Sequence, residues 1–252
     1  MLNFLAKSKY ILGLNSRNLN YLYPLNLKRA VLIADSKLIA KERLKKAGLP
    51  ILQTYNIIRT RQDLENFNWA SLPKSFTLKP NRGYGGGGIL TVYGKKKNQP
   101  DVWVLADRGK VSVDDLKNHI WNILEGNFSL IGLPDMAFFE ERSKVLKLFK
   151  PYSFRGIPDI RIIVFNKTPI MAELRLPTQD SGGRANLHQG GIGVGIDIGS
   201  GITTHAIQYD KTIECYPDSR LPLRGVKIPY WKDILGLAIE AQTISQLGLA
   251  GI

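Results

Sequence analysis

A run of glycines between two alternating segments is the feature that most limits how this chain can fold. Residues 83–88 hold five glycines in six positions, and the segments 75–80 and 88–94 on either side alternate apolar and polar residues. Alternation with period two is typical of strands, so the pattern predicts a β-hairpin with a glycine-rich tip. It is not a Walker A loop, which joins a strand to a helix and ends in Gly-Lys-Ser/Thr. The exposed backbone N–H groups could wrap phosphates beside Lys79, or the tip could simply be a flexible turn.

The remaining hydrophobic pattern mixes strands and helices without a regular strand–helix–strand repeat. Ser36 suits a helix N-cap, and Gly48 suits the left-handed residue that ends the same helix. Strands are expected at 30–34, 51–60, 75–80, 88–94, 102–107, 136–143, 159–165 and 169–177, and helices at 37–48, 61–70, 113–126 and from 230 toward 249. Such a mixture indicates an α+β fold.

The chain is strongly basic, which indicates an anionic partner without naming it. Lys and Arg total 35 against 21 Asp and Glu, a formal net charge of +14. This excess could attract nucleic acid, anionic lipid, a nucleotide or an acidic peptide. The single Cys215 excludes an intrachain disulfide framework, and three histidines without a CxxC pair leave too few ligands for a zinc site. Neither a signal peptide nor a membrane span is evident, so a cytoplasmic location is expected.

Two acidic residues follow an apolar strand in the middle of the chain. Phe138 and Phe139 lead directly into Glu140 and Glu141. Such a strand end could form an adenine slot, in which the backbone and Glu140 address the exocyclic amine. It could equally be an ordinary strand terminus at the surface.

Cationic residues accompany the two strong β runs and the stretch that follows them. Arg161 and Arg175 alternate with apolar residues on adjacent runs, so both could project from one face. Arg184 and Asn186 lie in the glycine-rich stretch 178–204, which is expected to be one long loop. Cations and an amide suit an acyl phosphate and a transferring phosphoryl group. The same arginines would also fit a solvated surface.

The order of these motifs resembles that of ATP-grasp ligases of the RimK type. A lysine opens a helix that ends in AGLP, then come Lys-Pro with its glycine loop, an acidic strand end, DIR and RANLHQGG. The sequence resembles still more closely the RimK-related, alpha-L-glutamate ligase-like proteins. The segments PYSFRGIPDIRIIVF, MAELRLPT and ANLHQGGIGVGIDI carry this similarity, which covers nearly the whole chain.

The resemblance implies a role for each motif in a carboxylate–amine ligation. ATP would phosphorylate a carboxylate of an acceptor, an amine such as that of an amino acid would attack the acyl phosphate, and ADP and phosphate would leave. The implied cofactors are ATP and Mg²⁺. The implied phosphate ligands are Lys37 and Lys79, the closing loop is Gly85, Gly86, Gly87 and Gly88, the adenine end is Glu140 with Glu141, and the catalytic residues around the γ-phosphate and acyl phosphate are Arg161, Arg184 and Asn186.

The family fold has two α+β subdomains that sandwich the nucleotide. We expect a short N-terminal segment at 1–36, the small subdomain at 37–137 and the core subdomain at 138–252. Only 36 residues precede Lys37, too few for the Rossmann-like domain of RimK-type enzymes. The family continues past the final helix into strands that supply its magnesium ligands. The resemblance therefore predicts an incomplete core, no metal ligand within 1–252, and no ligase activity from these residues alone.

Two other functions fit parts of the sequence. The high positive charge would suit a nucleic-acid-binding module, but the chain lacks interleaved aromatic stacking motifs such as the RNP signature. A nucleotide-binding pseudoenzyme would retain the ligase fold and only sense ATP. We expect no membrane span and hold nucleic acid to be the weaker alternative.

Overall fold

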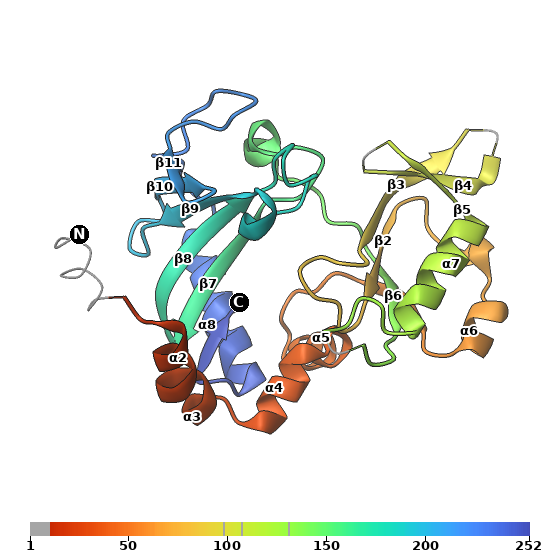
Figure 1. Cartoon of the computed structure of the whole chain (residues 1–252), viewed down its shortest axis with the longest axis horizontal. Helices are drawn as coiled ribbons and strands as arrows, with labels where there is room; N and C mark the ends of the chain where they lie inside the picture. The colour runs from red at the N-terminus through yellow and green to blue at the C-terminus, as the bar shows by residue number, and fades with distance from the viewer. Residues whose placement is uncertain (1–10, 98, 107, 131) are drawn as a thin grey trace.

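The computed structural model describes residues 11–97, 99–106, 108–130 and 132–252, whose strands form two antiparallel sheets in two lobes (Figure 1). The first sheet has the order β1-β6-β2-β3-β4-β5, and the second β11-β10-β9-β8-β7-β12. Strands of the first are β1 Thr54–Ile58, β2 Phe76–Pro80, β3 Leu90–Lys96, β4 Gln99–Leu105, β5 Lys110–Ser112 and β6 Ala137–Glu140. Strands of the second are β7 Asp159–Phe165, β8 Thr168–Leu176, β9 Ile192–Ile196, β10 Thr203–Gln208, β11 Lys211–Ile213 and β12 Leu249–Gly251. The expected α+β fold is confirmed.

The first lobe packs one face of its sheet against the helices α6 (Arg61–Glu65) and α7 (Val113–Leu124). A capping box formed by Ser112 and Asp115 begins α7. Its apolar positions are buried at helical spacing against the sheet, as predicted; they are Leu116, Ile120, Ile123 and Leu124. Strands β2 and β3 pair antiparallel, so the predicted hairpin is confirmed. Strand β6 also belongs to this sheet, which therefore extends to residue 140.

The second lobe buries one face of its sheet under α8 (Trp231–Ser245) and the 3₁₀ segment Lys147–Tyr152. Alternation along β7 and β8 sends Ile162, Val164 and Leu174 into this core. The residues between them face the other way. Asp159 pairs with Arg175 and Arg161 with Glu173 in the register of the two strands, so these four side chains share one polar face.

The described part of the N-terminal segment is mostly helical, and one expectation there is wrong. It forms α2 Leu14–Arg17, the π-helical turn Asn18–Leu22, α3 Tyr23–Leu25, α4 Lys28–Asp35 and α5 Lys37–Lys46. Residues 30–34, expected as a strand, lie in α4, because a short apolar run does not by itself distinguish a strand from a helix. The N–H groups of Ala30 and Val31 donate to the carbonyl of Leu27 and begin this helix. The predicted caps of α5 are found: Ser36 accepts from the Ile39 N–H, and Gly48 is left-handed.

The stretch 178–204 is not one long loop. It contains the 3₁₀ turn Leu187–Gln189, the whole of β9 and the start of β10. In β9, Ile192, Val194 and Ile196 alternate with glycines. Because a high glycine content is more typical of loops than of strands, the composition of this segment indicated a loop. The irregular parts are 178–191, apart from its 3₁₀ turn, and 197–202 between β9 and β10, and the first of these carries Arg184 and Asn186.

The C-terminal residues return to the second sheet. The helix α8 ends at Ser245, and β12 pairs antiparallel with β7, with Ala250 opposite Val164. The apolar start noted at 249–252 is this strand. Among the described residues, no helix combines the length and apolar character needed to cross a membrane.

Candidate functional site

Three lysines and one carboxylate lie together on the face of the first sheet that its helices do not cover. Glu140 is buried, and the register of β2 with β6 sets it diagonally to Lys79 on the same face. Its Oε1 forms an ion pair with Lys79, and its Oε2 lies 2.5 Å from Nζ of Lys41. Lys37 is a neighbour of this group, since its ammonium interacts electrostatically with both Lys79 and Glu140. The cluster is thus a buried anion surrounded by cations at the end of β2.

Asn81 ties this cluster to the N-terminus of α5. Its Oδ1 accepts from Ser36 Oγ at 3.0 Å and from the Leu38 N–H at 2.9 Å. Lys37 Nζ donates to the carbonyls of Asn81 and Gly83, at 3.1 and 2.9 Å. Burial lowers the pKa of Lys37; Asp135 opposes this shift, and Lys79 adds to it. The lysine is therefore aimed at the start of the glycine loop by fixed backbone oxygens.

The glycine loop is a compact turn rather than a loose tip. The Gly87 N–H donates to the Tyr84 carbonyl at 2.9 Å, and Gly88 has φ +73° with its α-carbon against the Phe128 ring. A Cβ on Gly88 would lie 2.7 Å from that ring, so this position requires glycine. His119 Nε2 donates to the Gly88 carbonyl at 2.8 Å and fixes the end of the loop to α7.

The loop 184–189 of the second lobe is equally well fixed. Asn186 caps the 3₁₀ turn, because its Oδ1 accepts from the His188 N–H at 3.0 Å. Its carbonyl accepts from the N–H groups of Gln189 and Gly191. This leaves the amide nitrogen of Asn186 directed away from its own loop. It lies 3.8 Å from the position that a Cβ would take on Gly85 of the first lobe.

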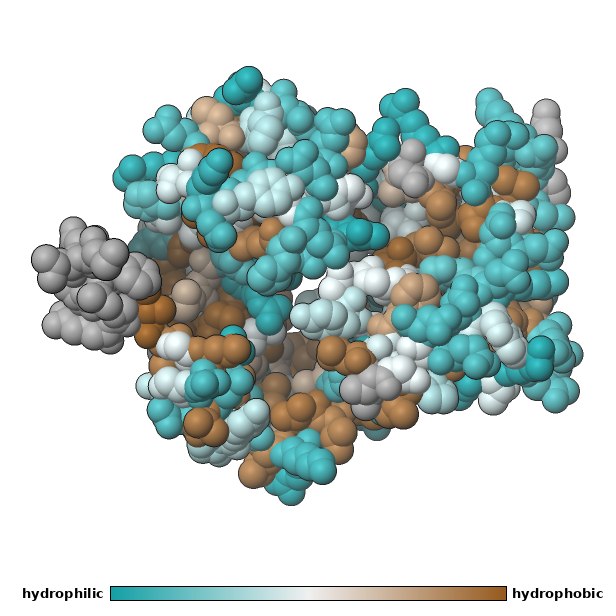
Figure 2. All heavy atoms as spheres, viewed as in Figure 1, coloured by the Kyte–Doolittle hydropathy of each residue, from teal (hydrophilic) through white to brown (hydrophobic). Residues whose placement is uncertain are grey.

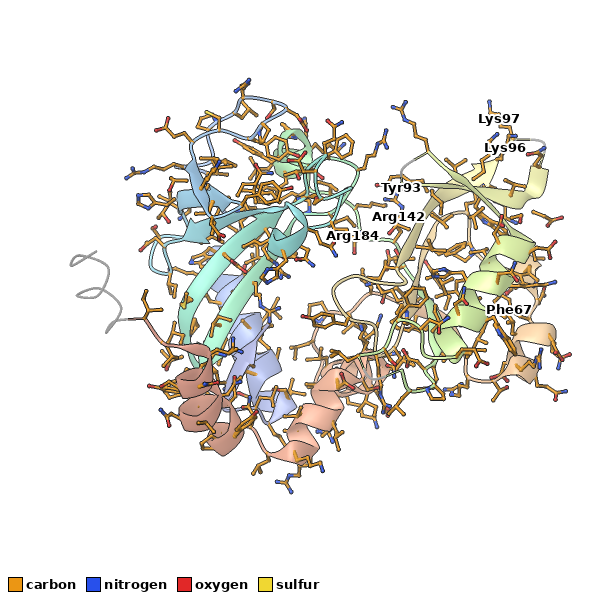
Figure 3. All side chains as sticks on the ribbon, in the orientation of Figure 1. Phe67, Tyr93, Lys96, Lys97, Arg142 and Arg184 are labelled. Atoms are coloured by element: carbon orange, nitrogen blue, oxygen red, sulfur yellow. The ribbon has the colours of Figure 1, made fainter. Side chains whose placement is uncertain are left out.

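The two loops together line a pocket of about 400 Å³ between the lobes. The glycine loop contributes Tyr84, Gly85 and Gly87, and the second lobe contributes Arg184, Asn186, His188 and Gln189. Figure 3 shows Arg184 at the edge of the second lobe that faces the first. Two glycines of the loop, Arg184 and Asn186 thus line one cavity, and the Gly87 N–H is already bonded to the Tyr84 carbonyl. Such a lining suits a polyanion with several oxygens.

The structure brings some predicted site residues into this pocket and leaves others outside its lining. Gly86 and Gly88 belong to the same loop as Gly85 and Gly87. Arg161 does not line the pocket and lies over Gly251 of β12. Glu141 is exposed, and its backbone N–H donates to the Gln53 carbonyl, so it is separate from the buried Glu140 cluster.

Three residues in or near these clusters were not selected by sequence reasoning: Lys41, Asn81 and Arg142. Lys41 follows Lys37 by one helical turn, a spacing that could have suggested it. Asn81 stands within the glycine-loop motif itself. Arg142 lies over the Tyr93 ring at 4.4 Å, on the side of the first lobe that faces Arg184 (Figure 3). This last contact joins β3 to the residues after β6, and no local sequence signal gives it.

The described carboxylates do not fit a magnesium site. Across the part of the chain that the structure describes, no three His, Cys, Asp or Glu side chains come together as metal ligands would. Glu140 is paired with two lysines, and Asp159 accepts two hydrogen bonds from Arg175, at 2.6 and 2.9 Å. Magnesium prefers carboxylates arranged octahedrally with water, and these two are occupied by cations.

Comparison with known proteins gives one family and a set of distant structures. The profile of the family described as sugar-transfer associated ATP-grasp matches residues 16–252. No curated protein matches the sequence. D-alanine–D-alanine ligase from Bacillus anthracis is 14% identical with a TM-score of 0.44, over 90% of this chain and 54% of that chain. The ATP-grasp ligase PsnB with its minimal precursor is 14% identical with a TM-score of 0.39, over 90% and 49%. The chain thus spans about half the length of these structures.

Proposed function

This chain belongs to the sugar-transfer associated ATP-grasp family, and from that premise we propose that it is part of an ATP-dependent carboxylate–amine ligase. The observation that carries the proposal is the pocket between the lobes, which the glycine loop, Arg184 and Asn186 line together. Because the chain covers about half of the related solved structures, the activity, the substrates and the partners are all part of the proposal.

In the proposed site, the nucleotide lies between the two lobes. Lys37 and Lys79 hold its phosphates, and the loop from Gly85 to Gly88 covers them with backbone N–H groups. The ion pair of Glu140 with Lys79 supports this role, since it fixes the Lys79 ammonium group near the end of β2, just before the glycine loop. Glu140 and Glu141 would lie toward the adenine end.

The second lobe would serve the reacting groups. The guanidinium of Arg184 and the amide nitrogen of Asn186 reach the pocket opposite the glycine loop, where a terminal phosphoryl group would lie. They would stabilise negative charge as the phosphoryl group passes to a carboxylate and as an amine then attacks the acyl phosphate. Arg161, which lies over Gly251 of β12 and outside the pocket lining, would act from the polar face of β7. No step is assigned to magnesium, because the described carboxylates do not form its ligand set.

The finer features of the proposal follow the resemblance to RimK-related proteins. The amine would be glutamate or a similar amino acid, the acceptor a peptide, protein or small molecule with a carboxylate, and the location cytoplasmic. The two sheets would be the small and the core subdomain, and because β6 belongs to the first sheet, the division would follow residue 140 and not the expected residue 137. Residues 1–252 alone are expected to bind nucleotide without completing the ligation, since Asp159 and Glu140 are held by cations.

Removing the charge of Lys79 tests the nucleotide site. Lys79→Met keeps the aliphatic stem and should weaken ADP binding by about 1.5–3 kcal/mol, the loss typical of a charged hydrogen bond. Lys74→Met, at an exposed lysine shortly before β2, is the matched control and should bind as the parent protein does. Calorimetric titration measures both, and equal affinities of all three proteins would remove the assignment.

An ADP-release assay with amino acids supplied, with and without chelator, tests the ligase reaction. Nucleotide binding without turnover under every condition agrees with the proposal for residues 1–252, and it is also what a nucleotide-sensing pseudoenzyme would give. Chelator-sensitive turnover would support the ligase and contradict the expected inactivity of these residues. Oligonucleotide binding with a steep salt dependence and no ADP binding would favour a nucleic-acid module.

A further inference from the structure

Exposed apolar side chains are concentrated at the N-terminal helices. Nine of the 26 large hydrophobic residues that are exposed in the described chain fall between residues 11 and 32. They are Ile11, Leu12, Leu14, Leu19, Tyr21, Tyr23, Leu27, Val31 and Leu32. Figure 2 shows hydrophobic residues along the lower edge of the molecule, where α2 to α4 lie in Figure 1. A concentration of this kind on a folded protein marks an interaction surface.

This surface is held in place by the body of the protein. The Asn26 amide donates to the Leu249 carbonyl at 2.8 Å and accepts from its N–H at 3.0 Å. The Tyr21 ring packs edge-on against Phe165, and Ala30 is fully buried. These contacts anchor the segment to the second lobe, and the exposed apolar side chains of the same helices define their outer side.

The charge of the same segment has one sign. Residues 1–34 contain Lys7, Lys9, Arg17, Lys28 and Arg29 and no Asp or Glu; the first acidic residue is Asp35. Helices that combine exposed Leu and Tyr with Lys and Arg bind the interface of anionic bilayers, where apolar side chains enter the acyl boundary and cations meet the headgroups.

We propose that the outer side of the helices over residues 11–32 docks this protein on the surface of an anionic membrane. The protein would lie on the bilayer without crossing it. Leu14, Leu19 and Tyr23, each more than 60% exposed, would enter the interface, and Lys28 with Arg29 would contact the headgroups. The pocket between the lobes belongs to other segments of the chain, so this surface is independent of the proposed ligase site.

Vesicle sedimentation tests the docking surface. The full chain should sediment with vesicles of phosphatidylcholine and phosphatidylglycerol and remain in solution with phosphatidylcholine alone. Lys28→Gln with Arg29→Gln should weaken binding about 25-fold, about fivefold for each cation removed. Leu14→Glu with Leu19→Glu should abolish sedimentation. The matched control, Leu133→Glu with Leu148→Glu, changes exposed leucines elsewhere and should bind as the parent does.

Each other outcome counts against the proposal. No sedimentation of the parent chain with anionic vesicles overturns it, and so does equal loss of binding in the control variant. If the parent chain is a dimer that Leu14→Glu with Leu19→Glu dissociates, and vesicles do not bind, the surface is an interface between copies. Circular dichroism verifies that the glutamate variants fold. If the glutamate variants do not fold, two measurements test the proposal instead: vesicle binding by the glutamine variant and the salt dependence of vesicle binding by the parent protein.

Discussion

At the scale of single residues, Lys37 is expected to couple the proposed nucleotide binding to protonation. Burial lowers the pKa of its ammonium group, with Lys79 adding to the shift. Between the lowered pKa and its usual range, the unfolded chain holds more protons on this group than the folded one, so its contribution to stability rises with pH there. A phosphate beside the ammonium would raise the pKa again.

Nucleotide binding at alkaline pH, near the usual range of lysine, should therefore take up protons. The measurement is calorimetry of ADP binding in buffers of different ionisation enthalpy. Lys37→Met should remove the uptake, whereas Lys45→Met, exposed on the same helix, should not. Equal proton uptake in Lys37→Met would show that another group titrates.

Arg184 is expected to distinguish ATP from ADP. It lines the pocket opposite the glycine loop, where the proposal locates the terminal phosphate. Arg184→Ala should lower ATP affinity about tenfold, as for one lost charged hydrogen bond, with ADP affinity unchanged. Arg155→Ala, an exposed arginine outside the pocket lining, serves as the control. An equal loss of affinity for both nucleotides would show that Arg184 does not contact the terminal phosphate.

At the scale of elements, the glycine loop depends on one close contact with α7 and the segment that follows it. Gly88 combines a left-handed backbone with an α-carbon against Phe128. Gly88→Ala should therefore lower the free energy of unfolding by about 1–3 kcal/mol. Gly94→Ala, in β3 with open space around its α-carbon, should change it far less. Urea denaturation measures both, and equal effects would mean that Phe128 yields to the added methyl.

Most helices and strands can be predicted from the sequence, and the wrong predictions have physical causes. Alternation of apolar and polar residues predicts the hairpin of β2 and β3. Apolar residues at helical spacing predict α7 with its buried leucines and isoleucines. Residues 30–34 were misassigned because a five-residue apolar run suits either structure until its packing is known. Strand β9 was missed because glycines occupy its second face.

The site was predictable only in part, for a related reason. Motifs identify the glycine loop and the Arg184 loop, but not that Gly85 and Asn186 meet across the two lobes. The pairing of Lys41 with Glu140 and the contact of Arg142 with Tyr93 also join distant segments. Such contacts depend on the relative placement of sheets, which no local pattern encodes.

At the scale of the whole molecule, the pocket lies between two lobes that have separate hydrophobic cores. Its lining is divided between residues 84–87 and residues 184–189, and these loops approach each other at Gly85 and Asn186. A polyanion bound there would contact both loops at once. It would thereby reduce the opening of each loop, because ligand binding stabilises the states that make the contacts.

Hydrogen exchange should reveal this coupling. ADP or ATP should slow exchange in both 83–89 and 184–191, while amides in the centre of α7, already protected by the first core, should not change. Lys79 lies in the first lobe. Lys79→Met should nevertheless reduce the protection of the amides of 184–191 from exchange, at a fixed nucleotide concentration, as much as it reduces the protection of 83–89. Lys74→Met should leave both unchanged. Protection confined to the first lobe would mean that the nucleotide contacts only one side, and the pocket between the lobes would then not be its site.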